Sequence, residues 1–239
     1  MNTPSHLFLL AGQSNMAGRG ILEDEDTIPH ERVLTLNKDG DWVPAVDPIH
    51  FDKPNKGVCL GRNFGIDIAE QDAEIVIGLI PAACGGSPIS VWQPGMYFKG
   101  TESHPYDDAI QRTKRAMEDG VLKGILWHQG ETDSLEPDLV EIYEDRLRRL
   151  IKRFRDEFNS PNLPFIIGQM GQFLGSEFDR DGLVNEAHVA IAKEDNNAAY
   201  IPSDGLGCLD DNVHFDAPAL HEFGRRYAEA YLRLEESKV

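Results

Sequence analysis

Five short apolar runs alternate with segments of helical character, and this alternation is the feature that most constrains how the chain can fold. The apolar runs are Leu7–Ala11, Ile75–Pro81, Gly124–His128, Pro164–Met170 and Ala198–Pro202. The helical segments are Leu60–Gln71, Tyr106–Asp119, Pro137–Phe158, Leu183–Glu194 and Pro218–Glu235. Strands that are apolar throughout are buried on both faces, and parallel strands need helical crossovers. We therefore predict an α/β fold, a three-layer α/β/α sandwich with a central, mainly parallel five-stranded sheet.

The same pattern predicts one domain over residues 1–239, because no linker, internal repeat or low-complexity tract interrupts it. The stretch Leu22–Asn55 is rich in Asp, Pro and Gly and predicts a long excursion, with a small hairpin at Val33–Val43. The segment Pro137–Phe158 has one apolar stripe and a basic opposite side, which indicates a helix that covers the sheet and exposes its charges.

Charge and composition exclude several classes of partner. The chain has 41 acidic and 23 basic residues and a net charge of −18, so phosphate backbones and anionic membrane surfaces would be repelled. Its apolar runs are far shorter than the roughly 20 residues of a membrane helix. We expect no nucleic-acid partner and no membrane insertion, and no apolar stripe indicates an oligomeric state.

Cysteine usage bears on the compartment. Cys59, Cys84 and Cys208 are odd in number and lack C-x-x-C spacing, which argues against a disulfide framework and a structural zinc site. No basic segment precedes Leu7, and the apolar run there is too short for a signal peptide. We expect a cytoplasmic protein, although a secreted chain already trimmed of its signal would look the same.

A serine follows the first predicted strand, in Gly12-Gln13-Ser14-Asn15-Met16. Ligand sites in parallel sheets lie beyond the carboxyl ends of the strands, so Ser14 is a candidate nucleophile. The alternative is that Ser14 caps the next helix. The residues that follow the other strands distinguish the two.

Those residues supply the other parts that acyl transfer requires. His214, near the C-terminus, is a candidate base for Ser14, and Asp211 could orient its imidazole if residues 211–214 form a turn. An oxyanion also needs donors. The candidates are the backbone N–H of Ser14, that of Gly85 or Gly86, and the carboxamide of Gln129. Each motif alone is weak, and Asp211 and His214 could be ordinary loop residues.

Four motifs together resemble the sialate O-acetylesterase and acetylxylan esterase group of the SGNH hydrolases, the sixth carbohydrate esterase family. The motifs are Leu10–Gly18 around the serine, Gly85–Trp92, Trp127–Asp133 with its H-Q-G-E block, and Asp211–Phe215. They occur in the family's order and span most of the chain. The resemblance implies a flavodoxin-like SGNH fold and hydrolysis of acetyl esters on sugars.

Carried over by motif, the resemblance makes Ser14 the nucleophile, His214 the base and Asp211 its orienter. The oxyanion donors would be Ser14, Gln129 and one of the two glycines, of which we favour Gly86 over Gly85. Glu131 and His128 would hold the loop or line the pocket, and Asn15 would steady the turn. Trp92 would either wall the substrate pocket or belong to the core.

The sequence therefore predicts a serine esterase that acts through an acyl-enzyme on acetylated carbohydrates, with no metal or organic cofactor. The G-x-S-x-G elbow is absent, because Met16 stands at the second glycine position, which favours an SGNH arrangement over an α/β-hydrolase. Two alternatives are a broad short-chain acyl esterase and a catalytically silent carbohydrate-binding protein. Xylan fragments, sialic acids and other acetylated sugars all fit, and Leu22–Asn55 with Trp92–Ser103 would shape the choice.

Overall fold

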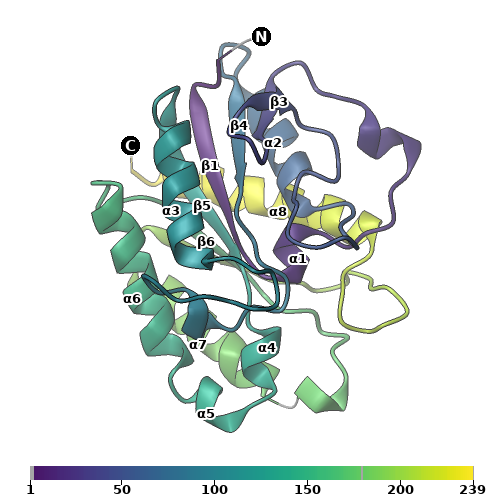
Figure 1. The fold of residues 1–239 in the computed structure, drawn as a ribbon, viewed down its shortest axis with the longest axis vertical. Coiled ribbons are helices and arrows are strands. Elements are labelled where there is room, and N and C mark those ends of the chain that lie inside the picture. Colours follow the sequence, from purple (N-terminus) through teal and green to yellow (C-terminus); the bar gives the residue numbers. More distant parts are fainter. Residues whose placement is uncertain (1–2, 179, 239) are drawn as a thin grey trace.

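A seven-stranded sheet forms the centre of the molecule in the computed structural model, which describes residues 3–178 and 180–238 (Figure 1). The strand order is β3-β2-β4-β1-β5-β6-β7, and every pairing is parallel except that of β2 with β3. The strands are β1 (His6–Gly12), β2 (Val33–Leu36), β3 (Trp42–Pro44), β4 (Ile77–Pro81), β5 (Val121–His128), β6 (Phe165–Gly168) and β7 (Ala198–Ile201). The mainly parallel sheet is confirmed, with seven strands rather than five.

The two additional strands come from the excursion. The predicted hairpin at Val33–Val43 is present as β2 and β3, and β2 also pairs with β4, so the hairpin extends the sheet at one edge. These strands are only four and three residues long. Their short, partly polar pattern was too weak to predict membership of the main sheet.

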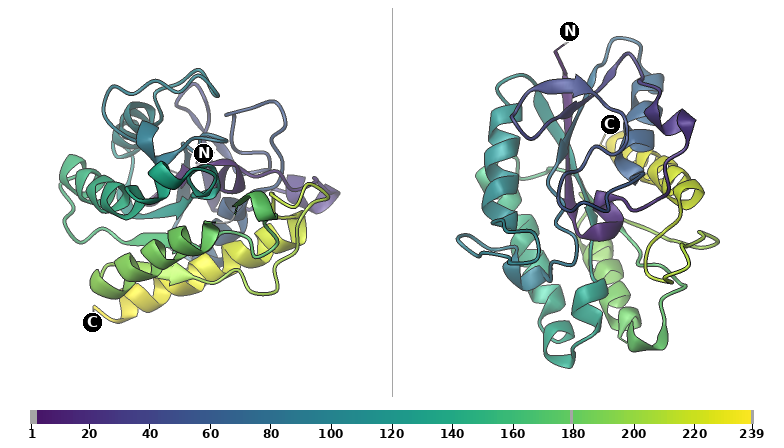
Figure 2. Two further views of the ribbon diagram at one scale, coloured as in Figure 1. Left: turned by 90° about the horizontal axis from the view of Figure 1, so that it is seen from below. Right: turned by 45° about the vertical axis from the view of Figure 1, so that its right-hand side comes forward.

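Helices cover both faces of the sheet, which confirms the three-layer sandwich (Figure 2). The α-helices are α1 (Ser14–Ala17), α2 (Leu60–Gln71), α3 (Pro105–Ala116), α4 (Glu131–Ser134), α5 (Pro137–Val140), α6 (Tyr143–Glu157), α7 (Asp181–Glu194) and α8 (Ala217–Glu236). Short 3-10 helices occur at Asp24–Thr27, Ile89–Val91 and Ser176–Phe178. The predicted helix Pro137–Phe158 is two helices, and the break falls just before Tyr143, whose side chain is buried.

Alternation along β1 shows how the two core layers form. Leu7, Leu9 and Ala11 point into the layer that contains α3, α6 and α7. Phe8 and Leu10 point into the layer that contains α2 and α8. Because both faces are covered, β1 is buried almost throughout, as the apolar run predicted.

The central strand β1 also delivers the candidate nucleophile to the carboxyl edge of the sheet. Gly12 lies opposite His128 in the register of β1 and β5, and a Cβ on Gly12 would lie 2.1 Å from the His128 carbonyl oxygen. Gly12 also has φ of +134°, which favours glycine. The close approach places the residues after β1 beside those after β5. Within the described residues, no helix is long and apolar enough to cross a membrane, and all three cysteines are unpaired.

Candidate active site

Ser14, His214 and Asp211 form a hydrogen-bonded relay at the carboxyl edge of the sheet. The Ser14 hydroxyl lies 3.0 Å from His214 Nε2, and His214 Nδ1 lies 2.6 Å from Asp211 Oδ2. Ser14 is the first residue of α1 and is 7% exposed. The cap interpretation is not needed, because Ser14 begins the helix and Gln13, the residue at the cap position, makes no side-chain capping bond. This geometry is that of a nucleophile, a base and an orienting acid.

A tight loop sets the spacing between Asp211 and His214. Asp211 Oδ1 accepts hydrogen bonds from the backbone N–H groups of Val213 and His214. Asn212, which follows Asp211, has φ of +51°. The loop turns the carboxylate back toward the imidazole, as the predicted turn requires. Burial alone would raise the pKa of Asp211, but the hydrogen bonds from His214 and from the two backbone amides outweigh it and lower that pKa. Asp211 therefore stays ionised beside His214.

The two glycines after β4 differ in what their backbone N–H groups do. The Gly85 N–H donates to Asp52 Oδ2 at 2.9 Å, and the same carboxylate oxygen lies 2.7 Å from Arg19 in a buried ion pair. The Gly86 N–H has no hydrogen-bond partner within residues 3–178 and 180–238. The same holds for the Ser14 N–H. Of the two glycines, Gly86 therefore has the N–H that remains available to a ligand.

The side chain of Gln129 is fully enclosed. Its Nε2 contacts three acceptors, namely the Ser87 carbonyl oxygen at 3.1 Å, Gln13 Oε1 at 3.2 Å and, by a shorter hydrogen bond, Asp133 Oδ2. Its Oε1 accepts from the Tyr143 hydroxyl at 3.0 Å, and Gln129 is 0% exposed. An amide nitrogen carries two protons. Both are used by protein acceptors, an arrangement that does not match the donor role predicted for Gln129.

Asn15 connects the serine turn to two other segments of the site. Its Nδ2 donates to Glu131 Oε1 at 2.6 Å and to the Val213 carbonyl oxygen at 3.0 Å, while its Oδ1 accepts from the Phe215 N–H at 3.1 Å. Asn15 thus holds both residues that flank His214. Burial alone would raise the pKa of Glu131, but the adjacent His128 and the Asn15 hydrogen bond outweigh it and lower that pKa.

The remaining predicted residues lie behind the site. His128 is fully buried, with its ring edge-on to Phe215 and Phe223. Trp92 is also buried, lies edge-on to Trp127, and donates from Nε1 to Ser87 Oγ at 3.0 Å. Both side chains are almost without solvent exposure. Burial of the Trp92 indole in the core, edge-on to Trp127, favours the core alternative over the pocket wall.

Sequence reasoning missed several residues that hold the site together. The ion pair between Arg19 and Asp52 anchors the excursion against the glycine loop, and Asp133 accepts from the Ile89 N–H. Burial raises the pKa of Asp133 to about 6. Gln13 was passed over although it directly precedes Ser14. No spacing rule identifies such partners, since each is defined by a contact between distant segments.

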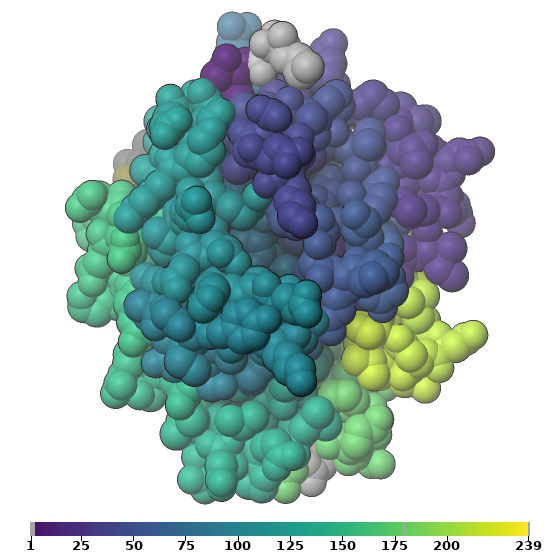
Figure 3. All heavy atoms as spheres, viewed as in Figure 1, coloured from purple at the N-terminus to yellow at the C-terminus, as the bar shows by residue number. Residues whose placement is uncertain are grey.

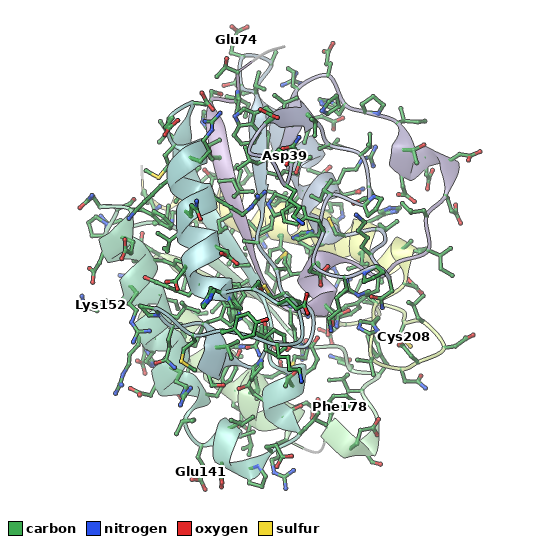
Figure 4. The ribbon with its side chains drawn as sticks, in the orientation of Figure 1. Asp39, Glu74, Glu141, Lys152, Phe178 and Cys208 are labelled. Atoms are coloured by element: carbon green, nitrogen blue, oxygen red, sulfur yellow. The ribbon has the colours of Figure 1, made fainter. Side chains whose placement is uncertain are left out.

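A cavity of about 640 Å³ lies at the carboxyl ends of β2 and β4; its lining includes Cys84, which precedes the Gly85–Gly86 pair, but not Ser14, Asp211 or His214. Its walls come from residues 36–40 and 50–52 of the excursion, from residues 81–84 and 101–104, and from α3. Figure 3 shows the face where these segments meet, and Figure 4 labels Asp39 in the cavity wall and Cys208 on the loop that carries Asp211 and His214. No cluster of His, Cys, Asp or Glu suited to a metal occurs in the described part of the chain.

The layered fold and the Ser–His–Asp arrangement are those of an SGNH-type hydrolase. Residues 4–233 match the family described as carbohydrate esterase, sialic acid-specific acetylesterase. The chain belongs to this family, and it is a carboxylic ester hydrolase of the carbohydrate esterase kind.

Individual relatives agree with that membership. The probable carbohydrate esterase At4g34215 of Arabidopsis thaliana is 32% identical over 96% of this chain and 91% of its own length. The crystal structure of that plant protein has a TM-score of 0.84 at 31% identity and covers 96% of this chain and 98% of its own. NanS shares the fold at a TM-score of 0.78 and 17% identity, over 99% of both chains. A carbohydrate acetylesterase from Xanthomonas citri has a TM-score of 0.72 at 18% identity, over 95% of this chain and 56% of its own.

Proposed function

We propose that the protein is a serine esterase that removes O-acetyl groups from carbohydrates through an acyl-enzyme. The observation that carries the proposal is the Ser14–His214–Asp211 relay beside the free N–H groups of Ser14 and Gly86. A relay and free donors at one strand edge are what acyl transfer needs. A binding protein would need neither an activated hydroxyl nor an oriented base.

The proposed reaction has two steps and uses the contacts of Ser14 and His214. His214 Nε2 removes the Ser14 proton as Oγ attacks the acetyl carbon, and the carbonyl electron pair moves to oxygen, where the N–H groups of Ser14 and Gly86 stabilise it. The carbon–oxygen bond to the sugar then breaks as the imidazolium returns its proton to the leaving alcohol. Water attacks the acetyl-enzyme by the same route and releases acetate and free serine.

The surroundings of Ser14 favour a small acyl group and a bulky alcohol. Ser14 and its two neighbours are buried, which leaves little room for a long acyl chain at the nucleophile. The cavity at the carboxyl ends of β2 and β4, which is lined by both apolar and charged side chains, offers room for a saccharide. Its walls include residues 36–40, 50–52 and 101–104, parts of the two segments that the sequence predicted to shape sugar choice.

The test is acetate release from a panel of acetylated xylo-oligosaccharides and O-acetyl sialic acids, compared between the wild-type protein and Ser14→Ala. We expect release from at least one saccharide class and none above background from the variant, with an unchanged thermal unfolding temperature. An acyl-length series on a chromogenic alcohol tests the acyl preference. Retained turnover by Ser14→Ala, or equal rates for acetyl and long-chain esters of simple alcohols with none for sugars, would refute the proposal.

A further inference from the structure

Lys53 lies along the two glycines that follow β4, partly withdrawn from water. A Cβ on Gly85 would lie 3.5 Å from Lys53 Cδ, and a Cβ on Gly86 would lie 3.6 Å from Lys53 Nζ. The side chain therefore follows the glycine pair, and its ammonium ends beside Gly86. The neighbouring lysines in sequence, Lys38 and Lys56, are exposed, whereas Lys53 is partly buried.

The residues before Lys53 fix the place from which its side chain starts. The ring of Phe51 packs under a guanidinium of α3, whose carbon lies 4.6 Å from the ring centroid. Asp52 Oδ2 lies 2.7 Å from Arg19 Nη2 and accepts from the Gly85 N–H at 2.9 Å. Both side chains of this ion pair are almost fully buried. Lys53 therefore extends from a segment that is tied to α3, to Arg19 and to the first glycine.

The Lys53 ammonium lacks a counter-ion. Within residues 3–178 and 180–238 it takes part in no hydrogen bond or ion pair, and the adjacent carboxylate of Asp52 is already paired with Arg19. A charge that is partly withdrawn from water is costly until a group of opposite charge pairs with it. In a chain with 41 acidic side chains, a lone ammonium at this place indicates an anionic ligand rather than a structural ion pair.

Gly86 connects this ammonium to the proposed reaction. Its backbone N–H is free, as is that of Ser14, so the acyl oxygen would lie against both. Ser14 itself is buried, and the small acetyl group fits on that side. The alcohol is then the part of the substrate that extends toward solvent. Lys53, partly exposed beside Gly86, is placed to meet the alcohol, which in the proposed function is a sugar.

We propose that Lys53 Nζ binds a carboxylate on the acetylated sugar, which makes the protein selective for acidic over neutral carbohydrates. This inference rests on the proposed esterase function. The contact does not involve the reacting atoms, so Lys53 is a specificity residue and not a catalytic one. Since the carboxylate is present in the ground state and in the transition state alike, the contact should lower KM without changing kcat.

The test compares kcat and KM on acidic and neutral acetylated sugars. Uronic acids and sialic acids both carry a carboxylate, so the acidic arms are an acetylated xylo-oligosaccharide with a uronic acid and an O-acetyl sialic acid. The readout is the ratio of kcat/KM on each acidic sugar to that on a neutral acetylated xylo-oligosaccharide. Lys53→Met should lower this ratio by roughly 10–100-fold for at least one acidic sugar, through KM, which is the loss expected for a hydrogen bond to a charged group.

Three comparisons separate a charge contact from a packing effect. Lys53→Arg should keep most of the ratio, because a guanidinium also donates to a carboxylate. Raised ionic strength should lower the wild-type ratio relative to that of Lys53→Met, because salt screens the contact. Lys123→Met is the matched control and should leave the ratio unchanged, because Lys123 is also partly buried but lies near the start of β5, at the opposite edge of the sheet.

Two outcomes would overturn the role of Lys53. One is a ratio in Lys53→Met equal to that of the wild type for both acidic sugars, and the other is an equal loss in Lys53→Arg. If Lys53→Met does not fold, as judged by thermal unfolding, Lys53→Gln takes its place. Ser14→Ala, run in parallel, keeps the two proposals apart. Its retained activity would refute the esterase mechanism, whereas its loss of activity together with an unchanged ratio in Lys53→Met would refute only the role of Lys53.

Discussion

At the residue scale, the site depends on side chains that hold other side chains. Asn15 is the clearest case, since its three hydrogen bonds reach Glu131, Val213 and Phe215. Val213 and Phe215 flank the catalytic-base candidate His214. Asn15, the neighbour of the nucleophile, therefore holds the residues on either side of the base, which lie 198 and 200 residues away in sequence.

Removal of the Asn15 side chain should lower kcat more than it lowers the free energy of unfolding. We expect Asn15→Ala to lower kcat by up to about 10²-fold, because a displacement of about 1 Å between reacting groups costs that much. Steady-state kinetics on an acetyl ester measure the effect, with the exposed Asn196→Ala as control. A wild-type kcat in Asn15→Ala would show that residues 211–214 hold His214 in place without the Asn15 hydrogen bonds.

Single residues show what the sequence could and could not predict. The motifs identified Ser14, His214 and Asp211, which the fold brings into one relay. They did not reveal that the Gln129 carboxamide is enclosed by protein acceptors, because Ser87 and Gln13 come from segments that are distant in sequence.

At the scale of elements, α2 and α8 pack closely because a glycine lies between them. A Cβ on Gly224 of α8 would lie 2.4 Å from the Leu60 carbonyl oxygen and 2.9 Å from the Phe64 backbone nitrogen of α2. Backbone atoms cannot move aside as a side chain can. This helix pair covers the face of the sheet that is opposite α3 and α6.

Gly224→Ala should therefore destabilise the protein, by about 1–3 kcal/mol for overpacking. Urea unfolding gives the free energy of unfolding. The matched control is Gly182→Ala at the start of α7, where a Cβ would meet nothing within 4 Å, so that this substitution should not destabilise the protein. Equal effects of the two substitutions would contradict the close packing of α2 and α8.

Element prediction succeeded where the hydrophobic pattern was long. The five predicted strands are all present, because each is an apolar run, although the edge strand β7 is only half-buried at Ala199 and Tyr200. The strands β2 and β3 were predicted only as a local hairpin, since three or four residues give too little alternation to indicate which sheet edge they join. The break between α5 and α6 was missed because the apolar stripe continues across it.

At the scale of the whole molecule, burial shifts the ionisation of Asp47, a carboxyl in the interior of this acidic chain. Burial raises the pKa of Asp47 to about 7 from an ordinary value of 3.8, against smaller lowering effects from Cys59 and Arg62. Between these two pH values the folded protein retains a proton that the unfolded chain releases. The contribution of Asp47 to the free energy of unfolding therefore falls as pH rises through this window.

Replacement by the uncharged isostere should remove that trend. We expect Asp47→Asn to gain stability relative to wild type as pH rises from about 4 to 7, by at most about 1.4 kcal/mol per pH unit. Urea unfolding at several pH values measures the difference, and the exposed Asp39→Asn serves as the control. A difference between Asp47→Asn and wild type that is constant with pH would show that Asp47 is ionised in the folded protein.

The central claim is that Ser14 is a nucleophile activated by His214, and covalent labelling tests it most directly. After treatment with an organophosphonate, mass spectrometry should find one adduct, on Ser14. Labelling should be absent in Ser14→Ala and slowed by roughly 10²–10⁴-fold in His214→Ala, the contribution of a general base. An adduct on another residue, or an active wild-type protein that takes no label at Ser14, would contradict the account.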